Sequence, residues 1–243
     1  YEDEKFMLPR KGFFKYKRNI GGLVMAFLIA SQGIGYWQIF ACFFILVTTV
    51  TRFLRSKNVN VIKSGATAIM AIVAAVVIHI IPEIFTMLTM NSEELIVRGR
   101  SFADGEMYSL KIAQLLLPVN GHGIDILDKL ISVYNSEMPL VNENRTAYIG
   151  AMGIIGFMFL IFWTFTNRKS DTVAGRRLAC LSDMNMCALL LACIGGFGSI
   201  VYIGGFSMLR CYNRISVFIA FICILATCIL LNYASINIKK KNM

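Results

Sequence analysis

Long apolar runs separated by short polar segments set the pattern of the chain. The runs occupy residues 19–35, 36–54, 64–85, 148–165, 184–202 and 215–233. An α-helix rises about 1.5 Å per residue, so about 20 apolar residues cross the roughly 30 Å of hydrocarbon in a bilayer. The pattern therefore predicts an all-α fold, a polytopic integral membrane helical bundle with about six transmembrane helices. The first run has a short apolar centre, and a re-entrant segment is the alternative there.

The composition supports a membrane protein. Hydrophobic residues make up 57% of the 243 residues and charged residues 16%, whereas soluble domains have about 45–50% and about 25%. This balance excludes a water-soluble globular enzyme and a disordered chain. The net charge of +10 lies in short clusters between apolar runs and forms no single basic surface. We therefore expect a lipid bilayer as the partner, and no nucleic acid.

The basic residues predict the orientation of the spans. Of the 24 Lys and Arg, 17 lie within 5–18, 52–63, 168–177 and 239–241, and seven lie in the alternate segments. Cytoplasmic loops are enriched in Lys and Arg, so both termini are predicted to be cytoplasmic. The layout is then a basic segment (1–18), three spans (19–85), an extracytoplasmic loop (86–147), three spans (148–233) and a basic tail (234–243). Because the chain begins at Tyr1, we also hypothesise that it is a fragment of a longer protein.

The loop 86–147 is predicted to be structured. Apolar residues recur at helical spacing over 104–119, with Asp104 as the N-cap and Pro118 ending the helix. A second amphipathic piece covers 124–134. Both are too short to span, so we expect short helices at the outer leaflet. Long loops in compact proteins are usually functional.

Two acids and a histidine in this loop are candidates for chemistry. Glu106 and Glu143 are candidate catalytic carboxylates, and His122 is a candidate general base or ligand for an anionic headgroup. The alternatives are a helix-end role for Glu106, a span boundary for Glu143 and a solvated turn for His122.

Arginines on the same predicted side are candidate phosphate ligands, because the planar guanidinium matches phosphate geometry. They are Arg98, Arg100, Arg210 and Arg214. The alternative is that they contact lipid headgroups without a specific role.

Two ionisable residues lie inside the third span. His79 and Glu83 are four residues apart and share a helix face. Ionisable groups in lipid are costly and point to function by default; placement at the interface is the alternative. No GxSxG, HExxH or Cys/His metal spacing is present, so we expect neither a metal nor a cofactor.

Several motifs resemble those of a known group of membrane proteins. They are EMYSLKIAQLLLPVNGH at 106–122, NEN at 142–144, CYNRIS at 211–216 and GIGYW at 33–37. They look like the C-terminal part of bacterial polytopic membrane glycosyltransferase-like proteins of the C type, a sugar transferase or translocase family. The resemblance implies a multi-pass protein of the bacterial cytoplasmic membrane that handles a polyprenyl-phosphate-linked sugar for cell-envelope glycan or lipid modification. It also implies that Glu106 or Glu143 activates the acceptor, and that Arg98, Arg210 and Arg214 hold the donor phosphate.

Two departures from that family keep other functions open. Its catalytic acids generally lie in the first outer loop, but residues 31–38 contain no acid, and Gly123 follows Gly121-His122 where a basic residue is expected. The alternatives are a translocase for a lipid-linked saccharide, and a non-catalytic membrane fragment or partner subunit.

Overall fold

The computed structural model describes residues 17–32, 35–89, 103–138, 143–166, 172–205 and 209–241. These residues form helices and no strand, which confirms the all-α prediction for this part of the chain. Three segments are long and apolar enough to cross a membrane: Tyr36–Ser56, Val59–Thr86 and Tyr212–Ile236. They indicate a membrane protein, and six spans stay a prediction. The chain divides into two compact units, 1–99 and 100–243.

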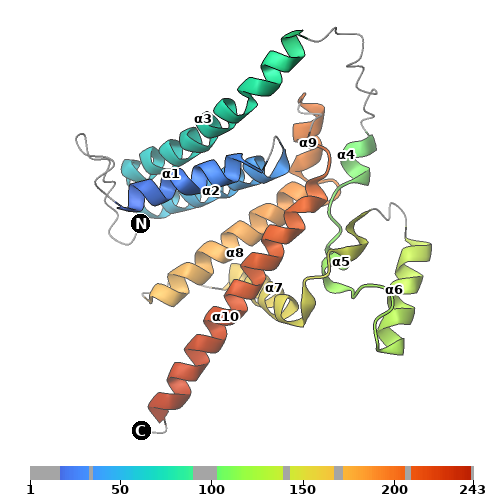
Figure 1. The fold of residues 1–243 in the computed structure, drawn as a ribbon. Helices are drawn as coiled ribbons and strands as arrows, with labels where there is room; N and C mark the ends of the chain where they lie inside the picture. The colour runs from blue at the N-terminus through green and yellow to red at the C-terminus, as the bar shows by residue number, and fades with distance from the viewer. Residues whose placement is uncertain are drawn as a thin grey trace. The chain divides into compact units, whose positions relative to one another are not determined.

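The first unit packs three helices side by side (Figure 1): α1 (Lys17–Ala30), α2 (Tyr36–Ser56) and α3 (Val59–Thr89). The side-chain amide of Gln38 donates to the carbonyls of Ile29 (3.1 Å) and Ala30 (3.4 Å), so it ties the start of α2 to the end of α1. Between α2 and α3, a Cβ at Gly65 would overlap the side chain of Thr49. Small residues of this kind let membrane helices approach closely.

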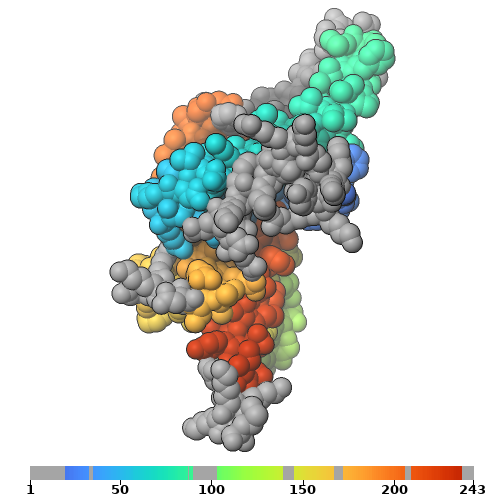
Figure 2. Space-filling view, turned by 90° about the vertical axis from the view of Figure 1, so that its left-hand side faces the viewer, coloured from blue at the N-terminus to red at the C-terminus, as the bar shows by residue number. Residues whose placement is uncertain are grey.

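The second unit is built around α7 (Gly150–Phe165), α8 (Val173–Ala192) and α10 (Ser216–Lys241). Figure 2 shows the amber surface of α8 adjoining the red surface of α10. Helices α7 and α10 meet at Gly156, where an added Cβ would overlap the carbonyl oxygen of Cys223 and lie 2.7 Å from Oγ1 of Thr227. The hydroxyl of Thr227 also donates to the carbonyl of Met152 at 2.8 Å. A glycine therefore sets the separation of these two helices.

Helices α7 and α8 are joined by hydroxyl groups. The buried Ser182 donates to the carbonyl of Leu160 at 2.8 Å, and its Oγ lies 2.7 Å from the hydroxyl of Thr164. On the same helix, the amide oxygen of buried Asn185 accepts from the thiol of Cys223 on α10, at 3.8 Å. Polar contacts of this kind help membrane helices to associate.

Replacing Ser182 with alanine is expected to lower the stability of the second unit by about 1 kcal/mol, because it removes the contacts with Leu160 and Thr164. Denaturation of the purified protein in detergent would measure the change. Ser132→Ala is the matched control, since Ser132 is exposed on another helix of the same unit. Equal stability of the Ser182→Ala and Ser132→Ala proteins would contradict a stabilising role of the Ser182 hydroxyl.

The chain between 184 and 202 differs from the predicted single span. Helix α8 begins 11 residues before Met184 and ends at Ala192, and the short α9 (Phe197–Ile203) follows a turn. Gly195 in this turn has φ +71°, a left-handed conformation that favours glycine and ends the helix. The start of α8 was not predicted because its first half is polar: Arg176 and Arg177 are exposed, and Ser182 and Asp183 are buried polar residues.

The loop helices are also shorter than predicted. The expected helix at 104–119 is two pieces, α4 (Ala103–Met107) and α5 (Ile112–Leu116), so Asp104 lies in the first turn of α4 and is not an N-cap. The second predicted piece is confirmed as α6 (Asp125–Glu137). The short 3-10 helix η3 (Glu143–Thr146) then leads to α7.

Candidate functional site

The stretch between α4 and α5 pairs with the end of α8, far away in sequence. The amide of Leu110 donates to the carbonyl of Ala192 (2.8 Å), and the amide of Ile194 donates to the carbonyl of Leu110 (3.3 Å). These bonds hold the backbone of Leu110 extended, so its amide is not used in a continuous helix. Long-range pairing, which local periodicity does not report, is therefore the physical reason why the single-helix prediction was wrong.

Glu106 holds the turn between α8 and α9. Its carboxylate accepts a hydrogen bond from the amide of Gly195 (2.9 Å) and another from the hydroxyl of Ser199, across about 90 residues of chain. Next to it, a Cβ at Gly105 would lie 3.1 Å from the ring of Tyr202, so α4 rests directly on α9. The carboxylate therefore acts as an acceptor that positions the turn. Its catalytic role stays a prediction.

Arg210 contacts two other side chains of this segment, one in α4 and one directly after it. Its Nη1 lies 3.4 Å from Oδ2 of Asp104, and its guanidinium carbon lies 5.2 Å from the centre of the Tyr108 ring. The carbonyl of Tyr108 accepts from the amide of Asn213 at 3.1 Å, so the 3-10 helix η4 (Tyr212–Ile215) is bonded to the same segment. We call the side chains of Asp104, Glu106, Tyr108, Ser199 and Arg210 the loop cluster.

Arg210 keeps its charge in this setting. Burial alone would lower its pKa, but the attraction of Cys211 and of Asp104, the hydrogen bond to Asp104 and the attraction of Tyr108 together raise the pKa above its ordinary value. The Arg210 side chain is 39% exposed and that of Asp104 is 23% exposed. A guanidinium carries five donors, and Asp104 engages one nitrogen. The group is thus a partly exposed, permanent cation that can contact an anion from solvent.

The other predicted site residues lie elsewhere in the second unit. His122 precedes α6, and its Nδ1 accepts from the amide of Ile124 in the same turn (3.3 Å). Arg214 is exposed on η4, four residues after Arg210. The structure thus holds Glu106 in α4 against Gly195 and Ser199, and Arg210 against Asp104 of the same helix. Arg214 lies on η4, and His122 has a contact only within its own turn.

Several predicted residues are not tested by this geometry. Arg98 and Arg100 lie outside the described residues, and Glu143 begins η3 with a side chain that is not described. His79 and Glu83 are both exposed on α3 in the first unit. The structure shows no hydrogen bond or ion pair between these two described side chains.

Asp104, Tyr108 and Ser199 were not predicted as site residues. Asp104 and Tyr108 are four residues apart, a spacing that places side chains on one helix face, and this was the only local signal. Nothing near Ser199 indicates a contact with Glu106. Within the described ranges, no three His, Cys, Asp or Glu side chains gather as a metal site would need.

The fold and the loop cluster define a helical membrane protein with a folded connecting segment. Comparison of the chain with protein-family models, with curated proteins and with solved structures finds no match. The function is therefore argued from the residues themselves.

Proposed function

We propose that the chain is the membrane part of a bacterial glycosyltransferase-like protein that handles a polyprenyl-phosphate-linked sugar at the extracytoplasmic face of the cytoplasmic membrane. The observation that supports this most is the loop cluster, in which a partly exposed Arg210 is held beside Asp104 and Tyr108. The product would be a cell-envelope glycan or a modified lipid.

The position of Arg210 along the chain suits a lipid phosphate. It lies two residues before the segment Tyr212–Ile236, which is long and apolar enough to cross a bilayer. Arg214 lies within the first turn of that segment and is exposed. Cations at the end of a span meet the level of the headgroups, where the phosphate of a membrane-anchored sugar donor also lies. Arg210 and Arg214 would bind that phosphate through charge-assisted hydrogen bonds.

A transferase also needs a carboxylate that accepts a proton from the acceptor hydroxyl as the new glycosidic bond forms. Glu106 and Glu143 are the proposed candidates. Glu106 already accepts two hydrogen bonds, from the amide of Gly195 and the hydroxyl of Ser199. It would act as the base only if the acceptor hydroxyl replaced one of these donors.

A specific observation favours translocation of the lipid-linked saccharide as the second candidate function. Helix α8 carries the buried polar residues Ser182, Asp183 and Asn185. Polar and ionisable groups within membrane bundles frequently mark substrate pathways. In this alternative the loop cluster would collect the lipid phosphate and α8 would contribute to the path.

The test is binding of undecaprenyl phosphate to the purified protein in lipid nanodiscs. We expect Arg210→Gln to weaken binding about tenfold or more, because a hydrogen bond to a charged group contributes about 1.5–3 kcal/mol. The matched control is Arg177→Gln, which removes the same charge from an exposed position 15 residues before the end of α8, about 22 Å along the helix axis.

Wild-type protein that binds no undecaprenyl phosphate, or equal affinity of the Arg210 and Arg177 variants, would overturn the proposal. Thermal unfolding of both variants separates loss of binding from loss of folding. Sugar release from a glycosylated polyprenyl phosphate would favour the transferase. Movement of that lipid across proteoliposomes without release would favour the translocase.

A further inference from the structure

The contact between Asp104 and Arg210 is a weak one for two opposite charges. Nη1 of Arg210 lies 3.4 Å from Oδ2 of Asp104, whereas charge-assisted N–H···O bonds are usually about 2.7–2.9 Å long. The contact joins one nitrogen to one oxygen, so it lacks the two parallel bonds of a bidentate arginine–carboxylate pair. Both side chains are partly exposed, and exposed ion pairs contribute little to stability. An anion that binds the guanidinium through two oxygens can therefore replace Asp104.

The ion pair is not needed to hold α4 in place. Glu106 of the same helix accepts two hydrogen bonds from the turn before α9 and from α9 itself. A Cβ at Gly105 would lie 3.1 Å from the ring of Tyr202, and Figure 1 shows α4 beside α9. These contacts fix α4 without Asp104. Its carboxylate can therefore leave Arg210 while the helix keeps its position.

Tyr108 contacts Arg210 in a different way. The guanidinium carbon lies 5.2 Å from the centre of the Tyr108 ring, within the roughly 6 Å range of a cation–π contact. The backbone of Tyr108 is fixed, because its carbonyl accepts from the amide of Asn213 and Leu110, two residues further on, pairs with the end of α8. A cation–π contact uses the face of the ring and engages no N–H donor. Tyr108 can therefore keep the guanidinium in place while its donors change partner.

We infer that Asp104 is the internal counter-ion of Arg210, which the phosphate of the polyprenyl lipid displaces, and that Tyr108 is a positioning residue that orients the guanidinium during this exchange. The inference rests on the proposed function. A phosphate offers oxygens that match the planar fork of arginine, and the partly exposed carboxylate of Asp104 is then solvated by water. The two residues thus have opposite effects on the affinity for the lipid: Asp104 lowers it and Tyr108 raises it.

Asp104→Asn is expected to strengthen binding of undecaprenyl phosphate in nanodiscs by about three- to fivefold, the strength of an exposed ion pair. The phosphate would no longer have to displace a carboxylate. Asp125→Asn is the matched control, because it removes the same charge from an exposed position in the first turn of α6. Thermal unfolding should show no gain in stability for Asp104→Asn, since the variant loses an ion pair. Tighter binding without greater stability separates a counter-ion from a structural residue.

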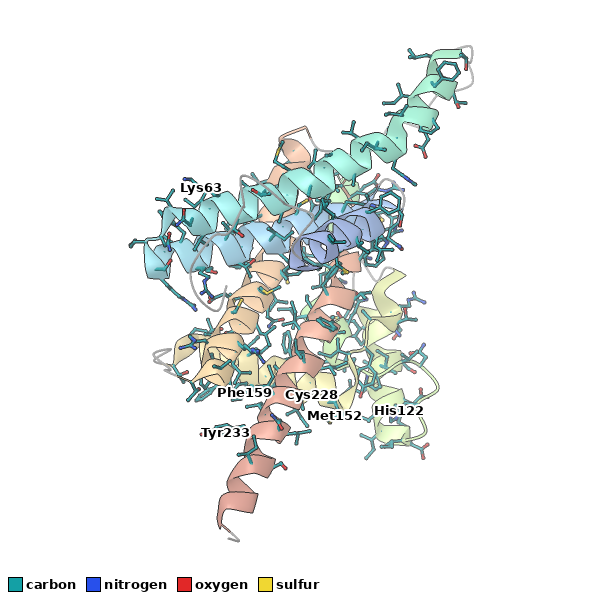
Figure 3. The ribbon with its side chains drawn as sticks, turned by 60° about the vertical axis from the view of Figure 1, so that its left-hand side comes forward. Lys63, His122, Met152, Phe159, Cys228 and Tyr233 are labelled. Atoms are coloured by element: carbon teal, nitrogen blue, oxygen red, sulfur yellow. The ribbon has the colours of Figure 1, made fainter. Side chains whose placement is uncertain are left out.

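Tyr108→Leu is expected to weaken the same binding by about threefold or more, because it removes the cation–π contact. Tyr108→Phe keeps the ring and should bind as the wild type does. The control is Tyr233→Leu, at an exposed tyrosine that Figure 3 labels in the C-terminal half of α10. It lies 17 residues after the start of that helix, about 25 Å along the axis, and its replacement should not change the affinity.

Two results would overturn the inference alone. They are an Asp104→Asn protein that binds no more tightly than Asp125→Asn, and a Tyr108→Phe protein that binds as weakly as Tyr108→Leu. In both cases binding by the wild type, and its loss in Arg210→Gln, would leave the proposed function standing. A wild type that binds no undecaprenyl phosphate would overturn the proposed function and this inference together. If Tyr108→Leu fails to fold, Asp104→Asn still decides, since its side chain has nearly the same shape as the native one.

Discussion

Replacing Gly156 with alanine is expected to force α7 and α10 apart and to lower the stability of the second unit by about 1–3 kcal/mol, the usual cost of overpacking. The single added carbon would overlap the backbone carbonyl of Cys223, which no side-chain rotation can relieve, and would crowd the hydroxyl of Thr227. The hydrogen bond from Thr227 to Met152 would be strained by the same movement. Gly156→Leu should exceed the alanine effect and prevent assembly of the three helices.

Denaturation in detergent measures this prediction, and Gly22→Ala is its control. Gly22 is also helical, but a Cβ there has no atom within 4 Å. Alanine exceeds glycine in helix propensity by about 1 kcal/mol, so the control should be unchanged or more stable. The α7–α10 contact would be wrong if Gly156→Ala matched Gly22→Ala.

Replacing Glu106 with alanine is expected to release the turn between α8 and α9 and to cost about 2–3 kcal/mol, because the change removes two charge-assisted hydrogen bonds. The donors left behind are the amide of Gly195 and the hydroxyl of Ser199. Glu106→Gln should cost about half as much, since its amide keeps one acceptor oxygen but turns an NH₂ group toward the second donor.

A double-mutant cycle with Ser199→Ala isolates this contact. We expect Ser199→Ala to destabilise the wild type and to have little effect in the Glu106→Ala background. Glu137→Gln, at the exposed end of α6, controls for the loss of one charge. Additive effects at 106 and 199 would rule out the contact. Loss of sugar transfer in Glu106→Gln, with stability kept, would instead support the catalytic role.

Local pattern was sufficient for the long apolar helices. The run 36–54 became α2 and the run 148–165 became α7 almost unchanged, because both runs are predominantly apolar over the helix length. Helix α6 was also predicted from its own periodicity. In each case the information lies within one helix, at the spacing that a helix imposes.

The loop cluster could not be predicted in this way. Glu106 is separated from Ser199 by 93 residues, and Asp104 from Arg210 by 106. A single sequence contains no signal for pairing over such separations. The polar part of α8 could not be predicted from the sequence either. Ser182 and Asn185 are buried by neighbouring helices, so a polar stretch that is typical of a loop forms part of the central helix of the unit.

The pairing of Asp104 with Arg210 also sets an order of events during synthesis. Chains grow at about 5–20 residues per second, so the 106 residues between these partners take roughly 5–20 seconds to make. Gly195 and Ser199 are made only in the last part of that interval, and Arg210 at its end. Helix α4 therefore remains without these partners until then. The loop cluster can form only after α8, α9 and η4 have all been synthesised.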